Sequence, residues 1–315
     1  MQNSFTLGRI AGIPVGVHYT WFFVAALLTW ALAQGYFPAL YPSWSATAYW
    51  VAGIVAALLL FASVLTHEFG HSLVAKARGV RVERITLFIF GGVAQMKQEA
   101  ERPGDDFVIG IAGPITSFAL AALFWAGSLA FPAPAVAGAV FGYLAFINLL
   151  LGAFNLVPGF PLDGGRVLRS IIWGATGSLR RATQVASYVG QGVGFLMLAW
   201  GAVRLLSGDT FGGLWTAMIG LFINNAAGSA RQTQETLEQL KGIQVAEVMN
   251  IHPAIVGPET TLQELIYVYV LRHGKRAVLV VDDHLLLGLV SVSDVKEVPQ
   301  ESWPTTTVSE VMTRV

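Results

Sequence analysis

Two histidines and a glutamate in residues 66–71, T-H-E-F-G-H, have the residue types of a hydrolytic metal site. If this segment is helical, His67 and His71 are four residues apart and lie on one face, so both imidazoles can bind one ion. Glu68 then projects about 100° further around the helix, beside a water in the open position of the metal. A carboxylate there can take a proton from that water and pass it to a leaving amine. The spacing therefore predicts metal-assisted hydrolysis, with Zn²⁺ as the ion that suits imidazole ligands.

The surroundings of this motif bear on an alternative, a chance pair of surface histidines. No Asp, Glu, Lys or Arg occurs between Arg9 and Glu68, so the glutamate ends a long uncharged stretch. A carboxylate within the hydrocarbon layer costs about 2.5 to 3.5 kcal/mol on insertion scales. The position of Glu68 at the edge of this layer therefore favours a functional role.

The composition indicates a membrane protein. Of the 315 residues, 54% are hydrophobic and only 12% are charged, with a mean hydropathy of +0.60, whereas soluble domains carry about 25% charge. The zero net charge argues against a nucleic acid partner. Because the chain has no cysteine, any metal must use histidine and carboxylate ligands. The first ten residues lack a signal-peptide pattern, so the first span is expected to stay in the protein.

The uncharged stretches predict six transmembrane helices in the lipid bilayer, at residues 15–33, 47–77, two within 107–162, 182–203 and 211–228. His18, inside the first of them, is expected to be an interior polar residue bonded to a neighbouring helix. Lys and Arg gather in residues 76–102 and 166–181, which predicts a multi-pass protein of the cell membrane with both termini cytoplasmic. The fold class is thus an α-helical polytopic membrane protein.

A second uncharged stretch ends at Asp163, within N-L-V-P-G-F-P-L-D-G-G-R at residues 155–166. The prolines and glycines break the helix, which membranes tolerate around functional cavities. A zinc ion held by two histidines needs a third protein ligand, and Asp163 is the best candidate. The alternative is that Asp163 only caps the following helix.

Residues 84–96 are β-branched and aromatic, interrupted by Gly91 and Gly92, and are too short to span as a helix. They are interpreted as a short re-entrant β segment lining a cavity. An ordinary surface hairpin is the alternative.

The composition becomes polar near residue 230, and V-A-E-V-M-N at residues 245–250 returns as V-S-E-V-M-T at 308–313. The expected domains are a transmembrane metalloprotease domain at 1–228, a linker at 229–242, a first repeat at 243–297 and the start of a second repeat at 298–315. Because repeats of this kind normally pack together, we expect the chain to be a truncated form of a longer protein.

Taken together, H-E-F-G-H, the N-L-V-P-G-F-P-L-D-G-G-R segment and six spans resemble the site-2 protease family of intramembrane zinc metalloproteases, over residues 8–228. The resemblance implies zinc bound by His67, His71 and Asp163, with Glu68 as the general base. It implies that Asn155 holds the substrate or the oxyanion, and that the segment at Gly91 and Gly92 guides an unwound substrate as an added strand. It also implies a membrane protein substrate with a transmembrane segment, such as an anti-sigma or pro-sigma type regulator.

The C-terminal part resembles an α/β CBS domain, carried by residues 245–250, 276–281 and 288–294. CBS pairs bind adenosine nucleotides such as ATP, and Ser291 and Asp294 match the G-x-x-S-x-x-D pattern that contacts the ribose. The resemblance implies either a nucleotide sensor or a module for homodimerisation.

Two further functions compete with the endopeptidase. One is a transporter or channel gated by the CBS domain, with the histidine and aspartate cluster as an ion site. The other is a membrane scaffold that uses zinc only structurally, which an open water position on the metal argues against. Inverted repeats would support a transporter, and the sequence contains no evident ones.

Overall fold

The computed structural model describes residues 4–89, 91–131, 134–240, 242–283 and 285–315. The described chain forms two compact units, residues 1–239 and 240–315, which we call the membrane unit and the C-terminal unit. Each is considered by itself.

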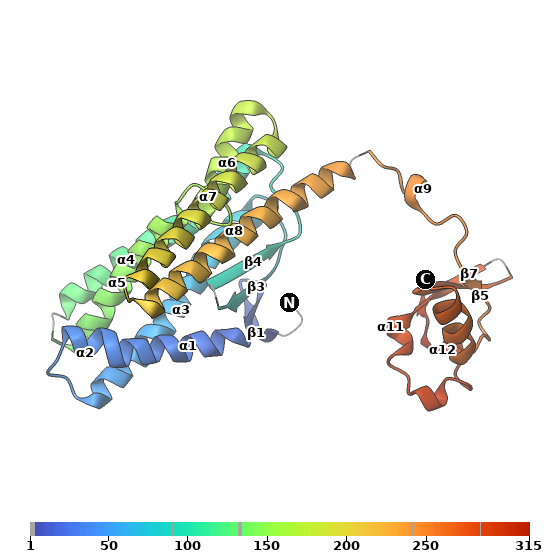
Figure 1. The fold of residues 1–315 in the computed structure, drawn as a ribbon, viewed down its shortest axis with the longest axis horizontal. Helices are drawn as coiled ribbons and strands as arrows, with labels where there is room; N and C mark the ends of the chain where they lie inside the picture. Colours follow the sequence, from blue (N-terminus) through green and yellow to red (C-terminus); the bar gives the residue numbers. More distant parts are fainter. Residues whose placement is uncertain (1–3, 90, 132–133, 241, 284) are drawn as a thin grey trace. The chain divides into compact units, whose positions relative to one another are not determined.

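Long helices dominate the membrane unit (Figure 1). Within the described residues, five segments are long and apolar enough to cross a membrane: Thr20–Leu40, Ala46–Ala77, Pro103–Ala130, Val136–Asn155 and Leu179–Leu206. The first combines α1 (Thr20–Ala31), a π-helical turn (Leu32–Tyr36) and α2 (Phe37–Leu40), and the others are α3, α4, α5 and α7. The sixth predicted span lies in α8 (Thr210–Gln239), which is not among these five. The amphipathic α6 (Asp163–Thr176) precedes α7.

A four-stranded sheet accompanies the helices, in the order β1 (Ser4–Ile10), β2 (Ile13–His18), β3 (Val82–Phe88) and β4 (Gly91–Met96). The predicted first span at 15–33 is therefore wrong at its start, because residues 15–18 belong to β2, a strand that pairs with β1 and β3. His18 ends β2 and so does not lie inside a span as predicted; its Nδ1 lies 2.9 Å from the hydroxyl of Thr20, the first residue of α1.

The predicted β segment contains β3 and β4, which pair antiparallel with each other. Because β4 is the last strand in the sheet order, one of its edges has no neighbouring strand among the described residues. Such an edge presents backbone N–H and C=O groups that can pair with another extended chain.

The helices of the membrane unit pack closely through small residues. Gly201 of α7 approaches the backbone of Ala217 in α8, and a Cβ added to Gly201 would lie 2.7 Å from the backbone nitrogen of Ala217. A Cβ added to Gly194 of α7 would lie 2.9 Å from the carbonyl oxygen of Gly220 in α8. Small residues let helix backbones approach each other in membranes, and α7 and α8 lie side by side in Figure 1.

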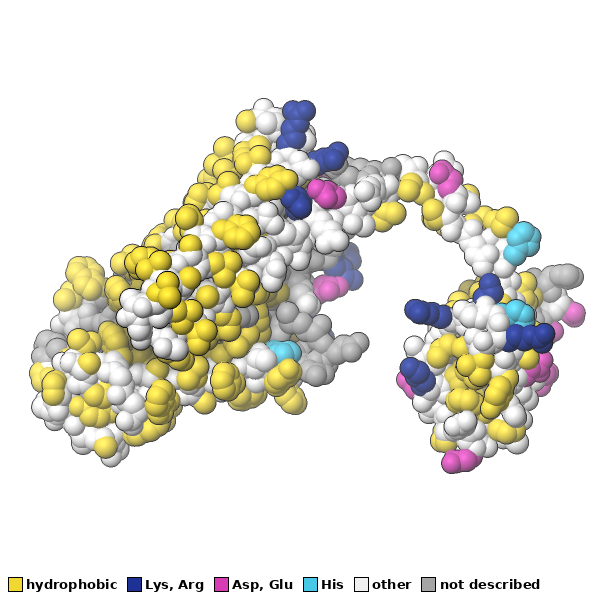
Figure 2. All heavy atoms as spheres, in the orientation of Figure 1, with side chains coloured by type: hydrophobic (Ala, Val, Ile, Leu, Met, Phe, Trp, Pro, Cys, Tyr) yellow, Lys and Arg dark blue, Asp and Glu magenta, His cyan; other side chains and the backbone are white. Residues whose placement is uncertain are grey.

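Charge and apolar surface are separated on the membrane unit. Figure 2 shows apolar side chains over most of its visible face, whereas Lys and Arg gather at the end near α6. The exposed apolar side chains include Phe22, Leu123, Trp125 and Leu196. This distribution is the one expected for a protein whose sides contact lipid.

The C-terminal unit contains a second four-stranded sheet, ordered β5 (Ile255–Val256), β6 (Ala277–Asp282), β7 (Leu285–Ser291) and β8 (Thr313–Arg314). Five short helical segments complete it: α9 (Val245–Val248), α10 (Leu262–Glu264), a π-helical segment (Leu265–Arg272), α11 (Val292–Val295) and α12 (Val308–Val311), with a 3-10 turn at Gln300–Ser302. Both copies of the repeated motif form a short helix with a capping box, α9 and α12. Val308 is fully buried in the core of this unit, whereas the equivalent Val245 is 77% exposed.

Candidate metal centre

Three side chains from two distant segments meet inside the membrane unit. Nε2 of His67 lies 3.1 Å from one carboxylate oxygen of Asp163, and Nε2 of His71 lies 3.1 Å from the other. The two Nε2 atoms are 3.3 Å apart. Both histidines are buried and the Asp163 side chain is 20% exposed. The three ligand atoms lie within 4.8 Å of one another, which makes this group a candidate metal site.

The hydrogen bonds of the imidazoles prepare their Nε2 atoms for a metal. Nδ1 of His71 lies 2.6 Å from the backbone carbonyl of Ile109, and because a carbonyl only accepts, this nitrogen must carry the hydrogen. Nε2 of His71 therefore has a free lone pair in the neutral ring. Nδ1 of His67 lies 2.8 Å from the Ser117 hydroxyl, which can hold the ring in the same tautomer.

The donor set and its spacing fit zinc. Two imidazoles and a carboxylate are the ligands of many catalytic zinc sites, which keep a fourth position for water. With metal–nitrogen distances of about 2.0 to 2.1 Å, two tetrahedral ligands are separated by about 3.3 Å. The measured distance between the two Nε2 atoms, 3.3 Å, matches this edge.

Glu68 lies between the two histidines and the edge strand β4. A Cβ added to Gly92 would lie 2.5 Å from Cγ of Glu68, so the glutamate packs directly against the strand and a larger residue at position 92 would displace it. The backbone of Ala94 also hydrogen-bonds the Glu68 carboxylate. Strand β4 thus orients the Glu68 carboxylate. The edge of β4 that does not pair with β3 has no neighbouring strand among the described residues.

Helix α4 supports the metal group, a contribution that the sequence analysis missed. Ile109, Gly113 and Ser117 follow one another at four-residue spacing on one face. Ile109 and Ser117 bond the two imidazoles, and a Cβ added to Gly113 would lie 2.1 Å from Nε2 of His71 and 2.6 Å from Nε2 of His67. The signal that could have revealed this face is the run of small residues Gly110, Gly113 and Ser117 at helical spacing.

The loop before α6 brings Asp163 to the histidines. Gly159, Gly164 and Gly165 allow close backbone contacts; for example, a Cβ added to Gly164 would lie 2.3 Å from the Leu156 carbonyl oxygen. The backbone N–H of Phe160 donates to the Ala186 carbonyl of α7 at 3.1 Å. The loop is therefore held against α7, and α6 begins at Asp163.

A second polar cluster ties α6 to α4. The fully buried Asp106 accepts from Nε of Arg166 at 2.7 Å and from Nε and Nη2 of Arg169 at 2.9 and 2.8 Å. Glu99 accepts from Nη1 of Arg169 at 3.2 Å. Burial alone would lower the pKa of Arg169, but the bonds to Asp106 and Glu99 raise it, so the guanidinium stays charged. This cluster fixes the first turns of α6, and hence Asp163, against α4.

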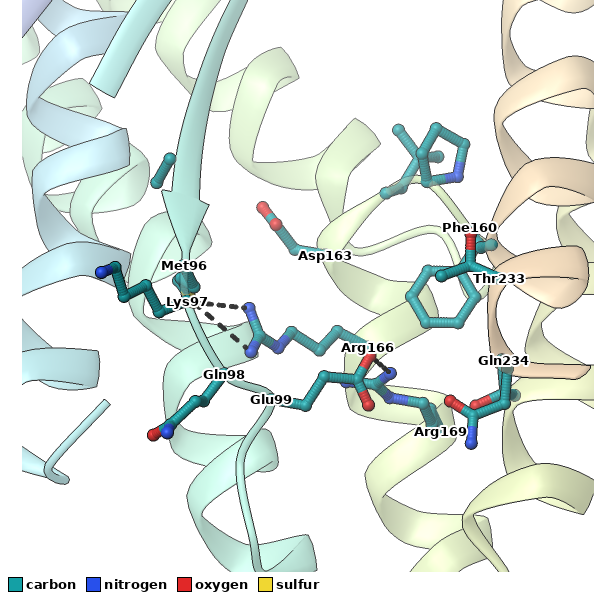
Figure 3. A pocket seen from close by; sticks show the side chains of 15 residues that line it. Met96, Lys97, Gln98, Glu99, Phe160, Asp163, Arg166, Arg169, Thr233 and Gln234 are labelled. Atoms are coloured by element: carbon teal, nitrogen blue, oxygen red, sulfur yellow. Dashed lines mark hydrogen bonds and ion pairs between the residues drawn. The ribbon is translucent and has the colours of Figure 1, made fainter. Parts of the chain in front are cut away.

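A cavity of about 470 Å³ opens beside Asp163 (Figure 3). Its walls come from the end of β4 and the following residues, the loop at 160–163, α6, α7 and α8. Figure 3 shows the Arg166 side chain extending from α6 to Met96 at the end of β4, on the same side of the cavity as Asp163. The cavity therefore connects the candidate metal group with the edge strand.

The other predicted residues lie outside the metal group. Asn155 is the last residue of α5 and is not among the residues that line the cavity. Gly91 begins β4 with a positive φ of 130°. Ser291 and Asp294 bond each other, since the backbone N–H and the hydroxyl of Ser291 donate to the Asp294 carboxylate at 2.7 and 2.8 Å. These bonds form the capping box of α11.

Comparisons with known proteins agree with this geometry. The sequence pattern of Peptidase family M50 matches residues 55–136 and 133–199, and that of the CBS domain matches residues 245–301. The chain is 38% identical to sll0528 of Synechocystis sp., named as a zinc metalloprotease, over 99% of this chain and 82% of that protein. It is also 38% identical to Rip3 of Mycobacterium tuberculosis, similarly named, over 99% of this chain and 80% of that protein.

A solved structure titled as a site-2 protease from Methanocaldococcus jannaschii superposes with a TM-score of 0.51 and 30% identity, covering 79% of this chain and 99% of the other. A multi-pass membrane zinc metalloprotease is therefore the class that this fold and this group of ligands define. The chain belongs to peptidase family M50, the site-2 proteases, and carries a C-terminal CBS domain. This membership places it among proteases rather than transporters or scaffolds.

Proposed function

We propose that this zinc metalloprotease is an intramembrane endopeptidase, which cleaves a peptide bond within or beside the transmembrane segment of another protein. The observation that carries the proposal is the convergence of His67, His71 and Asp163, whose ligand atoms lie within 4.8 Å of one another among apolar helices. These three side chains are the proposed zinc ligands. Bound zinc lowers the pKa of a coordinated water and polarises the substrate carbonyl.

Glu68 is the proposed general base. Its carboxylate takes a proton from the attacking water and delivers it to the amine that leaves when the peptide bond breaks. Its contacts with Gly92 and Ala94 hold it in place for both transfers. Asn155 is the proposed donor to the carbonyl oxygen as negative charge develops there, a role that requires it to approach the substrate from the end of α5.

The edge of β4 at Gly91 and Gly92 is the proposed substrate guide. A helical transmembrane segment hides its peptide bonds, so it must unwind before hydrolysis. Pairing with a strand edge satisfies the backbone groups that unwinding exposes. The free edge of β4 and its contact with Glu68 support this assignment, and the hairpin is proposed to be re-entrant on the same grounds.

The proposed topology has six spans, the sixth in α8, with both termini in the cytoplasm of a cell-membrane protein. The distribution of Lys and Arg supports this orientation. The CBS domain is proposed to bind an adenosine nucleotide through Ser291 and Asp294, or to pair with a second chain, and so to modulate cleavage. A change in cleavage rate on titration with ATP, lost in Asp294→Ala, supports the nucleotide role, and an unchanged rate contradicts it.

The test of the endopeptidase is cleavage of a single-span reporter protein in proteoliposomes with zinc. We expect the wild type to cleave within or beside the span, and Glu68→Gln to lose cleavage by a factor of about 10² to 10⁴ while keeping its zinc. Glu83→Gln, which alters a half-exposed carboxylate paired with Lys97, is the matched control. Full cleavage by Glu68→Gln would exclude the mechanism.

A further inference from the structure

Two arginines of α6 differ in how completely the fold uses their donors. Arg169 bonds Asp106 through Nε and Nη2, bonds Glu99 through Nη1, and lies 5.3 Å from the centre of the Phe160 ring. Its side chain is only 7% exposed. Arg169 is therefore a structural residue: each nitrogen of its guanidinium bonds a carboxylate, and the guanidinium also lies over the Phe160 ring.

Among the described residues, Arg166 donates to a strong acceptor through Nε only. Its Nε donates to Asp106 at 2.7 Å, but Nη1 and Nη2 lie 3.8 and 3.7 Å from the sulfur of Met96. A thioether is a weak acceptor, and within the described residues both nitrogens contact only this sulfur. Figure 3 shows this fork of donors pointing across the cavity toward the end of β4.

The charged neighbours leave this fork open to an anion. Glu99 is paired with Arg169, Lys97 lies 3.5 Å from Glu83, and Asp163 is engaged with the two imidazoles. A planar fork of two N–H groups matches a carboxylate, which can accept both bonds at once. The flexible Met96 side chain can move aside when such a group arrives.

Strand β4 determines how far Arg166 lies from the peptide bond that faces Glu68. Gly92 abuts Glu68, Ala94 bonds its carboxylate, and Met96 abuts Arg166. A substrate paired with β4 rises about 3.3 Å per residue, and alternate side chains share one face. The substrate residue facing Arg166 is therefore about two to four residues from the bond facing Glu68, which corresponds to about 7 to 13 Å.

We propose that Arg166 determines specificity by binding the carboxylate side chain of an Asp or Glu in the substrate, about two to four residues from the cleaved bond on the Met96 side. This inference rests on the proposed function, because it needs a polypeptide beside β4. It makes substrates with an acidic residue in this flank the preferred class. Because Arg166 acts on substrate binding, its replacement is expected mainly to raise KM.

The test uses single-span reporters in proteoliposomes, with an Asp moved one position at a time along the flank and a matched Asn reporter at each position. We expect the zinc-loaded wild type to show about a tenfold higher kcat/KM for Asp than for Asn at one position in the stated range. Arg166→Gln should cleave the Asp and Asn reporters at equal rates; only this ratio is compared, because Arg166 also bonds Asp106 and its loss affects the overall rate. Arg166→Lys, which lacks the fork, should lose most of the preference. Arg78→Gln, which alters an exposed arginine paired with Asp105, should retain it.

Equal cleavage of the Asp and Asn reporters by the wild type at every position overturns the proposal without any variant. Retention of the preference in Arg166→Gln also overturns it. Binding of the same reporters to Glu68→Gln, measured by fluorescence, supplies a readout that needs no catalysis and should show about tenfold tighter binding of the Asp reporter. Failure of the wild type to cleave any reporter would contradict the proposed function, while this binding difference would still decide the role of Arg166.

Discussion

Two carboxylates of the membrane unit, Asp106 and Asp163, differ in the partners that face their oxygens. Asp106 is fully buried and receives three hydrogen bonds from Arg166 and Arg169, so its negative charge is matched within the chain. Asp163 faces two imidazoles whose other nitrogens are already bonded to Ile109 and Ser117. The Ile109 carbonyl requires the hydrogen on Nδ1 of His71, and the Ser117 hydroxyl can accept the same arrangement in His67. In these neutral tautomers, the Nε2 atoms that face Asp163 carry lone pairs rather than hydrogens.

The difference distinguishes a structural cluster from a metal site. Acceptors and donors balance around Asp106, and the result is a rigid joint between α4 and α6. Around Asp163 three possible metal-ligand atoms lie close together, and a cation between them would be bound by all three. The joint and the site are connected, because the same helix α6 carries Asp163, Arg166 and Arg169.

Replacing Asp163 by Ala should have the largest effect. Removal of one of three protein ligands leaves two imidazoles, and we expect zinc retention to fall by about 100-fold or more and cleavage to be lost. Zinc content after gel filtration, measured by atomic emission, checks this. If Asp163→Ala keeps one zinc per chain, Asp163 is not a metal ligand and does not differ from Asp106 in the way described.

Gly113→Ala should empty the site without changing a ligand. The new Cβ would lie 2.1 Å from Nε2 of His71, so an imidazole must move away from the common point. We expect zinc binding and cleavage to fall by about 100-fold, as for a displaced ligand, with an unchanged helical circular dichroism spectrum. Gly142→Ala is the matched control, because a Cβ there meets nothing within 4 Å; equal behaviour of the two variants would contradict the geometry.

Asp106→Asn should affect stability more than metal binding. Breaking a buried ion pair costs about 3 to 5 kcal/mol, because Arg166 and Arg169 lose their shared partner. Thermal unfolding in detergent should show the loss, and the folded fraction should still bind zinc. Asp105→Asn, which breaks a more exposed pair with Arg78, should cost about 1 kcal/mol or less. Loss of zinc with unchanged stability would reverse the assignment of the two carboxylates.

Ser117→Ala should give the smallest effect, through the orientation of His67. Loss of a hydrogen bond to the remote nitrogen of a ligand typically costs about 10- to 100-fold in metal affinity. Competition with a chelator measures it. Ser128→Ala, which removes only a bond to the Trp125 carbonyl within α4, should leave the affinity unchanged.

The metal-site residue types could be predicted because they are chemically rare in their context. The ends of the uncharged stretches hold His67, Glu68, His71 and Asp163. Polar and ionisable groups at such positions are costly and usually have a function. The supporting residues on α4 could not be predicted, because Gly113 and Ser117 are common in membrane helices and their role depends on what faces them.

The start of the chain was misassigned for a physical reason. Residues 13–18, I-P-V-G-V-H, are apolar and adjoin an apolar helix, and hydropathy does not distinguish a buried strand from the start of a span. Val15, Gly16 and Val17 pair in parallel with Ile85, Thr86 and Leu87. This long-range pairing leaves no local signature in the sequence.

X-ray absorption at the zinc edge of the purified protein tests the central claim most directly. We predict one zinc per chain with two imidazole nitrogens at about 2.0 to 2.1 Å and carboxylate oxygen at about 2.0 to 2.2 Å, and a spectrum that loses the oxygen contribution in Asp163→Ala. A protein that binds no zinc, or a spectrum unchanged by loss of the Asp163 carboxylate, would contradict the assignment of His67, His71 and Asp163 as the metal site.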